Sequence, residues 1–291
     1  MSKIGVLIWR KLFEKGDEKR ITKQKQDISD LMIMKDIAYI DDDEQGHLLD
    51  VYRLPTTDET APVMINIHGG GLFASYKEVN AHFNYEWARM GYRVVSISYR
   101  RIPETTLWHQ IDDVMSALRF IRANTETFGL NLDRCYLTGD SAGALLSLFA
   151  LSINGSEKLQ QVFNIKGTGI RFRAAGLISI MLDTQRLDLH SLSNMVTNKA
   201  DKGKAYEKYL LGPVSLLKET ELPPLYLVTS KEDVIRKDTM KLKSHLTSEY
   251  RYKYFSKNKG RKLLHVFSVS YPMYPESKEV FQEMDSFFKE H

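Results

Sequence analysis

The stretch Gly139-Asp140-Ser141-Ala142-Gly143 decides the fold of this 291-residue chain. It follows a short β-prone run, Cys135-Tyr136-Leu137-Thr138, and it precedes an apolar helical run over 144–151. A strand, a sharp turn with a central serine and then a helix are typical of the G-x-S-x-G nucleophile elbow. The pattern therefore predicts Ser141 as a nucleophile and the Ala142 amide, at the helix N-terminus, as an oxyanion donor. A glycine-rich turn with a surface serine is the alternative, so the rest of the chain must supply the partners.

The composition is that of a globular protein with a sizeable core. Hydrophobic residues make up 43% of the chain and charged residues 27%, and the length permits one large α/β domain or two small ones. The formal net charge of +4 is too small and too dispersed to indicate nucleic-acid binding. The single cysteine, Cys135, excludes an intrachain disulfide, and its place at the start of a strand indicates a core residue rather than a nucleophile.

Targeting signals are not apparent in the sequence. The apolar stretch Gly5–Trp9 is shorter than a signal-peptide core, and no run approaches transmembrane length. We therefore expect a cytoplasmic protein without stable membrane insertion. The oligomeric state is left open, with a homodimer as one alternative.

Strands and helices alternate along most of the chain. Expected strands lie at 62–67, 93–99, 135–138, 174–180, 225–229 and 250–256, with helices at 77–90, 107–124, 237–248 and 276–289. An antiparallel hairpin is expected before them, from strands at 37–40 and 47–54. The alternation predicts an α/β fold with a mostly parallel central sheet flanked by helices. Together with the elbow, it predicts the α/β-hydrolase fold.

We place the α/β-hydrolase domain at 36–291 and expect two additions to its central sheet and helices, an N-terminal segment before it and an insertion within it. Residues 1–35 begin with apolar residues at helical spacing, so we expect a helix there. Such a helix can pack as part of a cap, which we favour, cover an active site or touch a membrane surface. Residues 183–212 are polar with little periodicity, and we interpret them as an inserted cap or lid.

The sequence His68-Gly69-Gly70-Gly71 follows an expected strand well before the elbow. Consecutive glycines can turn their amides toward one point because no Cβ restricts φ. We therefore predict that Gly69, Gly70 and Gly71 form the oxyanion loop, with Gly70 and Gly71 as the preferred donors. A flexible turn or an anion-binding loop is the alternative, and His68 is expected to brace the loop rather than act as a base.

The acid and the base are expected after later strands. Asp233 follows the strand 225–229 by a short loop, and its neighbour Glu232 is the alternative. His265 lies in a loop-like stretch after the last expected strand, whereas His245 falls inside the expected helix 237–248. The order Ser141, Asp233, His265 is the order expected of an α/β-hydrolase triad.

Several motifs in this order resemble the hormone-sensitive-lipase-like family of α/β-hydrolase esterases. They are His68–Gly71, Tyr99-Arg100-x-x-Pro103-Glu104, Gly139–Gly143, Pro223-Pro224, Asp233-x-x-Arg236-x-Asp238 and the helix from Asp112 to Asn124. The resemblance runs from about residue 36 to the C-terminus. It implies hydrolysis of carboxylic esters, usually with short acyl chains, by Ser141, His265 and Asp233 without a cofactor.

This chain departs from the family pattern at two places, and the resemblance also implies a cap. The family usually has glycine after the histidine, where this chain has Val266, and often Leu-Ala where this chain has Arg101-Ile102. The family cap is built from the N-terminal segment and the insertion after the sixth strand.

Three functions are compatible with these residues. A serine esterase acting on a small-molecule ester is the leading hypothesis, an amidase or peptidase would use the same triad, and a non-catalytic binder would keep only the fold. A zinc hydrolase is disfavoured because the chain has neither H-E-x-x-H nor a Cys/His cluster, so no metal is expected. Phe73, Tyr76, Trp108 and the lid are candidates for the substrate pocket, although Trp108 is equally compatible with core packing.

Overall fold

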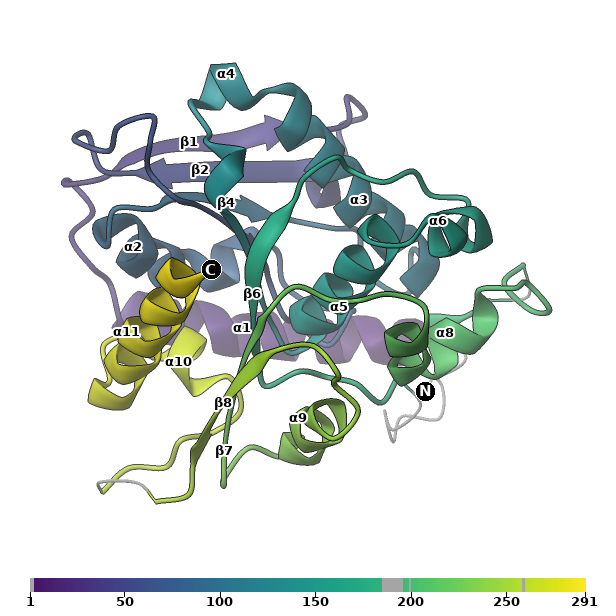
Figure 1. The fold of residues 1–291 in the computed structure, drawn as a ribbon. Coiled ribbons are helices and arrows are strands. Elements are labelled where there is room, and N and C mark those ends of the chain that lie inside the picture. The colour runs from purple at the N-terminus through teal and green to yellow at the C-terminus, as the bar shows by residue number, and fades with distance from the viewer. Residues whose placement is uncertain (1–2, 185–195, 199, 258–259) are drawn as a thin grey trace.

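A mixed sheet lies at the centre of the computed structural model, which describes residues 3–184, 196–198, 200–257 and 260–291 (Figure 1). Within these residues the sheet has eight strands in the order β1-β2-β4-β3-β5-β6-β7-β8. Strand β2 pairs antiparallel with both β1 and β4, and all other neighbours are parallel. The strands are Met32–Ala38 (β1), Leu48–Arg53 (β2), Val63–Ile67 (β3), Arg93–Ile97 (β4), Cys135–Asp140 (β5), Phe172–Ile178 (β6), Leu225–Ser230 (β7) and Tyr250–Phe255 (β8).

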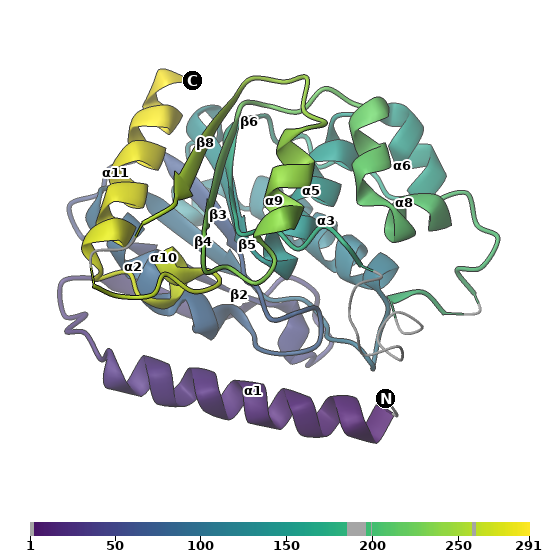
Figure 2. The same ribbon diagram turned by 90° about the horizontal axis from the view of Figure 1, so that it is seen from below.

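Helices cover both faces of the sheet. One apolar core lies under α3, α5, α6, α8 and α9, and a second lies under α2, α10 and α11 (Figures 1 and 2). The helices are Lys3–Lys23 (α1), Ala81–Arg89 (α2), Leu107–Ala123 (α3), Thr125–Phe128 (α4), Ala142–Asn154 (α5), Glu157–Phe163 (α6), Glu207–Leu211 (α8), Arg236–Lys243 (α9), Phe267–Ser270 (α10) and Pro275–Glu290 (α11). Short 3₁₀ helices occupy Gln45–His47, Lys77–Asn80, Leu132–Arg134 and Pro213–Lys218. The α/β-hydrolase fold predicted from the alternation of elements is confirmed.

Burial on both faces explains why the central strands read as continuous apolar runs. Every residue of β3, β4, β5 and β7 is buried, as expected of parallel strands between two helical layers. Cys135 lies in this core, and burial raises the pKa of its thiol. The edge strand β8 instead has exposed and half-buried residues, which accounts for its alternation of charged and aromatic side chains.

One expected helix is shorter than predicted. The segment 237–248 was expected to be helical throughout, but α9 ends at Lys243, so His245 lies in a turn. The Ser244 hydroxyl donates to the Lys241 carbonyl, and such side-chain bonds compete with helix continuation.

The N-terminal segment and the inserted segment have different outcomes. Helix α1 forms within the predicted segment 1–35 and lies along one side of the molecule (Figure 2). Within the predicted insertion 183–212, residues 185–195 and 199 are outside the described part of the chain, and α8 forms near its end. The division into domains remains a prediction. None of the described helices has both the length and the apolar character required to cross a bilayer.

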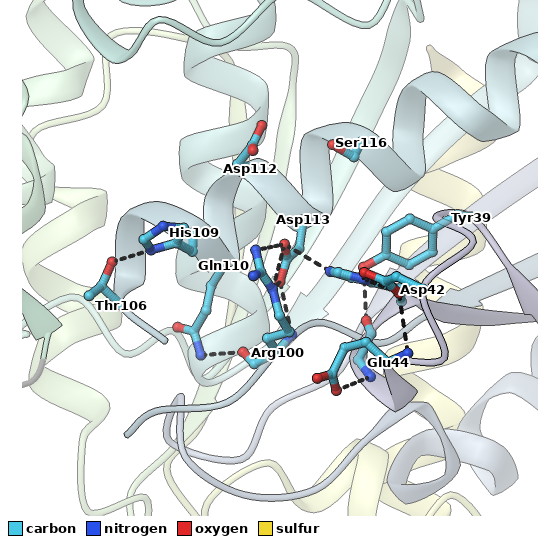
Figure 3. A network of polar contacts seen from close by, with 12 residues as sticks. Tyr39, Asp42, Glu44, Arg100, Thr106, His109, Gln110, Asp112, Asp113 and Ser116 are labelled. Atoms are coloured by element: carbon cyan, nitrogen blue, oxygen red, sulfur yellow. Dashed lines mark hydrogen bonds and ion pairs between the residues drawn. The ribbon is translucent and has the colours of Figure 1, made fainter. Parts of the chain in front are cut away.

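A buried polar network fixes the chain where it leaves β4 (Figure 3). The Arg100 guanidinium donates to the Asp113 carboxylate at 2.6 Å, and the Arg100 amide donates to it at 3.0 Å. His47 bridges Asp113 and Asp42, with nitrogen-to-oxygen distances of 3.2 and 2.8 Å. The Gln110 amide then donates to the carbonyls of Arg100 and Leu72. This network connects the hairpin, α3 and the loop that follows β3.

Candidate active site

Ser141 occupies a strained turn between β5 and α5. Its φ of 51° and ψ of −115° lie in a region that residues with a side chain rarely adopt. The flanking glycines make the turn feasible. A Cβ on Gly143 would collide with the carbonyl oxygens of Ile67 and His68, and one on Gly139 would collide with the Gly143 carbonyl oxygen. The turn therefore holds Ser141 at the tip of the strand, where it lines a cavity.

A chain of hydrogen bonds joins the three candidate residues from three different loops. Ser141 Oγ lies 2.9 Å from His265 Nε2, and His265 Nδ1 lies 2.9 Å from Asp233 Oδ1. Asp233 follows β7 and His265 precedes α10, so both stand with Ser141 at the carboxyl ends of the parallel strands. Asp233 is the carboxylate that accepts from His265 Nδ1, which favours it over Glu232.

The environment of Asp233 favours its ionised form. Burial alone raises the pKa of this carboxyl, but hydrogen bonds from His265, the Thr229 hydroxyl at 2.7 Å and the Ile235 amide at 2.9 Å outweigh burial and lower it. An ionised carboxylate can only accept hydrogen bonds, so the proton lies on His265 Nδ1 and Nε2 is free to accept one from Ser141. This is the tautomer that a histidine needs to act as a base toward serine.

The glycine loop lines the same cavity as Ser141. Gly70 and Gly71 have φ values of +128° and +61°, so the backbone there depends on glycine. The Ala142 amide lies in the first turn of α5, where amides lack an intrahelical acceptor. The assignment of the Gly70, Gly71 and Ala142 amides as oxyanion donors remains a prediction.

Gly69 is a correction to the predicted set of oxyanion donors. Its amide donates to Asp140 Oδ1 at 3.0 Å and so supplies a donor to a buried carboxylate. The Asn80 side chain donates to the same oxygen at 2.7 Å. Burial raises the pKa of Asp140, despite these hydrogen bonds. Gly69 therefore anchors the loop rather than contributing a donor.

His68 braces the loop, as expected from the sequence. It is fully buried, its ring stacks on Tyr99 with a centroid distance of 4.4 Å, and Nδ1 lies 2.5 Å from the Gly69 carbonyl oxygen. Burial lowers the pKa of His68 to about 3, so the ring is neutral at physiological pH. A neutral, enclosed imidazole with a structural partner is not the base of this site.

The cavity beside Ser141 has a volume of about 460 Å³ and apolar walls. Phe73, Met181, Val234, Ile235, Val266 and Val269 line it. Of the other predicted pocket residues, Trp108 packs against the core and donates to the Phe163 carbonyl, whereas Tyr76 stacks under the Arg101 guanidinium. From the lid, Asp183 lines the cavity, while 185–195 and 199 lie outside the described residues.

Some cavity residues were not identified from the sequence. Phe13, Asp17 and Arg20 of α1 close one side of the cavity, and Asp238 of α9 supports another by accepting the amides of Leu182 and Asp183. The helical spacing of the N-terminal segment was a signal for α1. The placement of its individual side chains depends on tertiary contacts that the spacing does not reveal.

Comparison with known proteins identifies related chains. The BD-FAE family model matches residues 49–235, which is more than half of the chain. The probable carboxylic ester hydrolase LipM of Mycobacterium tuberculosis is 31% identical over 209 residues, which cover 68% of this chain and 47% of LipM. The chain thus spans about half the length, or less, of such curated relatives.

Solved structures share the fold over nearly the whole chain. Esterase B of Lactobacillus rhamnosis, solved with a C4-C4 tributyrin phosphonate, superposes with a TM-score of 0.90 at 25% identity, covering 99% of this chain and 96% of that one. An esterase of the bacterial hormone-sensitive lipase family superposes with a TM-score of 0.73 at 19% identity, covering 97% and 90%. This likeness confirms, for the fold, the resemblance predicted from the motifs. The family match and the shared fold together show that this chain belongs to the BD-FAE family of α/β-hydrolase esterases.

Proposed function

We propose that this protein hydrolyses carboxylic esters with short acyl chains through a covalent acyl intermediate on Ser141. The observation that carries the proposal is the hydrogen-bonded chain from Ser141 through His265 to Asp233 at the tip of a strained strand-to-helix turn. The names of the relatives, among them a carboxylic ester hydrolase and an esterase, support the same reaction class.

The proposed reaction begins with attack of Ser141 Oγ on the ester carbonyl carbon. His265 Nε2 accepts the hydroxyl proton, and ionised Asp233 stabilises the resulting imidazolium. The carbonyl electron pair moves onto oxygen, where the amides of Gly70, Gly71 and Ala142 stabilise the negative charge. When the tetrahedral species collapses, His265 returns the proton to the departing alcohol and the acyl group stays on Ser141.

A water molecule completes the cycle. His265 takes a proton from this water as its oxygen attacks the acyl carbon, and a second tetrahedral species forms in the same oxyanion site. Collapse of this species returns the proton to Ser141 Oγ and releases the acid.

The size and walls of the cavity support the preference for short acyl chains. A volume of about 460 Å³ with apolar walls suits a small ester. Esterase B, solved with a tributyrin phosphonate that carries C4 chains, supports the same size class.

The experiment that tests the proposal is hydrolysis of p-nitrophenyl esters from acetate to laurate. We expect the highest kcat/KM at short chains and a fall of roughly 10⁴-fold or more in kcat for Ser141→Ala. Asp233→Asn should lower kcat by about 10³-fold to 10⁴-fold, whereas its neighbour Glu232→Gln, as the matched control, should retain activity. Retention of activity by Ser141→Ala, in protein purified from an esterase-deficient host, would contradict the proposed nucleophile.

A further inference from the structure

Helix α1 turns mainly polar side chains toward the domain, with Val6 and Phe13 as apolar exceptions. Four of its charged residues bond inward: Arg10 to the Phe73 carbonyl, Glu14 to the Ser75 amide, Asp17 to the Ser75 hydroxyl and Arg20 to the Ser270 carbonyl. Val6 is its only fully buried apolar residue. A surface helix normally buries an apolar stripe and exposes polar residues, so the orientation of α1 is inverted.

The outer face of α1 carries a stripe of large apolar residues. Ile4, Ile8 and Leu12 are four residues apart, so they form one stripe, and they are 70%, 56% and 61% exposed. Trp9 lies beside the stripe and is 50% exposed. Figure 2 shows that α1 runs along the side of the molecule with this outer side uncovered. Exposure of adjacent large apolar residues in this way indicates an interaction surface.

The same stripe becomes basic in the second half of the helix. Lys15 follows Leu12 by three residues, Lys19 and Lys23 come at further steps of four, and all three are exposed on the same side of the helix. Five lysines of α1 are exposed (Lys3, Lys11, Lys15, Lys19 and Lys23), against the single exposed carboxylate of Glu18. The partner of this face must therefore accept apolar side chains and also carry negative charge.

The helix also borders the mouth of the cavity. Phe13 lines the cavity and is itself 46% exposed, and Val234 lines it while being 79% exposed. A partner seated on the outer face of α1 would therefore lie beside the opening that leads to Ser141.

We propose that the outer face of α1 docks the protein onto the surface of an anionic lipid bilayer. Ile4, Ile8, Trp9 and Leu12 would enter the boundary between headgroups and acyl chains, and the lysine row would lie among anionic headgroups. This combination of an apolar face and a basic face is what holds interfacial helices in the plane of a membrane. Docking of this kind is peripheral and requires no membrane-spanning segment.

A second copy of the chain fits the face less well. Parallel pairing of two α1 helices would set the lysine rows against each other. Antiparallel pairing about Ile8 would match the apolar residues but leave the lysines without carboxylate partners on the opposite stripe. An anionic bilayer satisfies both halves of the helix, so we favour it as the occupant.

The test is binding of the full-length protein to vesicles of pure phosphatidylcholine and of phosphatidylcholine with 30% phosphatidylglycerol. Sedimentation gives the partition coefficient, and Trp9 supplies a second readout because Trp87 is fully buried and Trp108 is partly buried. We expect salt-sensitive binding that is stronger on the anionic vesicles, with a blue shift of the Trp9 emission. Trp9→Phe should remove that shift.

Two double variants separate the apolar and the basic contributions of the outer face of α1 to vesicle binding. Ile8→Gln with Leu12→Gln should lower the partition coefficient at least tenfold, since two large apolar side chains are lost from the interface. Lys15→Gln with Lys19→Gln should lower it by about 25-fold at low salt, roughly fivefold for each lysine. The matched control, Met32→Gln with Met34→Gln, replaces two exposed methionines of edge strand β1 and should leave binding unchanged.

Vesicle binding can be tested separately from the proposed hydrolysis at Ser141. Ser141→Ala should bind vesicles as the unchanged protein does, and the Ile8/Leu12 variant should hydrolyse soluble p-nitrophenyl acetate at the unchanged rate because neither residue lines the cavity. Absence of binding to either vesicle, or binding that both double variants leave intact, would overturn the docking proposal. A dimer in solution that the Ile8/Leu12 variant converts to monomers, without vesicle binding, would overturn it in favour of a second copy.

Discussion

The Gly69 amide donates to Asp140 Oδ1 at 3.0 Å, so the residue before the serine holds the start of the glycine loop. The bond joins two segments that the sequence separates by 71 residues, and it orients Gly70 and Gly71 toward the cavity. Removal of the carboxylate should loosen the loop. We expect Asp140→Ala to lower kcat by about 10-fold to 100-fold with a smaller change in KM, because misplaced oxyanion donors affect the transition state most.

Asp140→Asn is the control for this prediction. The asparagine carbonyl can still accept from Gly69, so its kcat should fall less than that of the alanine variant. Burial raises the pKa of Asp140, which also makes a neutral side chain easier to accommodate there. If kcat fell equally in the two variants, the reaction would require the charge of Asp140 rather than the position of the glycine loop.

Val266, next to His265, adopts a left-handed conformation with a φ of +51°. This is unfavourable for a β-branched residue, and the resemblance to hormone-sensitive-lipase-like esterases placed a glycine here. Val266→Gly should relieve the strain while losing some packing against the second core, so the free energy of unfolding should change by less than about 1 kcal/mol. Chemical denaturation checks this, with Val269→Ala, a buried neighbour, expected to lose about 2 kcal/mol.

The His47 bridge predicts a dependence of stability on pH. Burial alone lowers the pKa of His47, but the carboxylates of Asp113 and Asp42 outweigh it and raise the pKa above its ordinary value of 6.5. A raised pKa in the folded state contributes stability that is fully present below pH 6.5. This contribution is lost as the pH rises through the folded pKa. Arg100, Tyr39 and Glu44 also face this network, and Arg100 continues to pair with Asp113 throughout (Figure 3).

Comparison with His47→Gln isolates this contribution from the other titrating groups. At pH 6 the free energy of unfolding of the variant should be about 2 kcal/mol lower than that of the unchanged protein. This difference should become smaller by pH 9. Urea denaturation at the two pH values measures both. A gap that stays constant between them would mean that the His47 bridge is not charged.

The parts of the site that could be predicted are those encoded by local sequence and chain order. Ser141 and Asp233 follow strands that apolar runs identify, and His265 follows a strand of alternating charged and aromatic residues. Parallel strands bring such loops to one edge of the sheet. The role of Gly69 could not be predicted, because the direction of its amide depends on a buried carboxylate elsewhere in the chain. The same holds for α1. Its periodicity predicts a helix, but which side faces the domain is set by long-range hydrogen bonds such as that from Arg10 to Phe73.

Arg10 is the residue that fixes α1 to the domain most directly. Its guanidinium donates to the Phe73 carbonyl at 2.5 Å, to the Ile102 carbonyl at 2.6 Å and to the Glu104 carboxylate at 2.6 and 2.9 Å, and only 7% of the residue is exposed. Glutamine cannot reproduce these bonds, so Arg10→Gln leaves buried carbonyls without a donor. We expect a loss of about 2–3 kcal/mol in the stability of the docked helix.

Amide hydrogen exchange along α1 measures this loss directly. Exchange in α1 should accelerate by about 30-fold to 150-fold in Arg10→Gln, as 2–3 kcal/mol implies, while exchange in the core strand β5 should be unchanged. Because Phe13, Asp17 and Arg20 of α1 close one side of the cavity, KM for p-nitrophenyl butyrate should rise as well. Lys11→Gln, at an exposed neighbouring position, is the matched control and should alter neither quantity. Unchanged exchange in the Arg10 variant would mean that α1 is held by its other contacts, with Glu14, Asp17 and Arg20 sufficient to dock it.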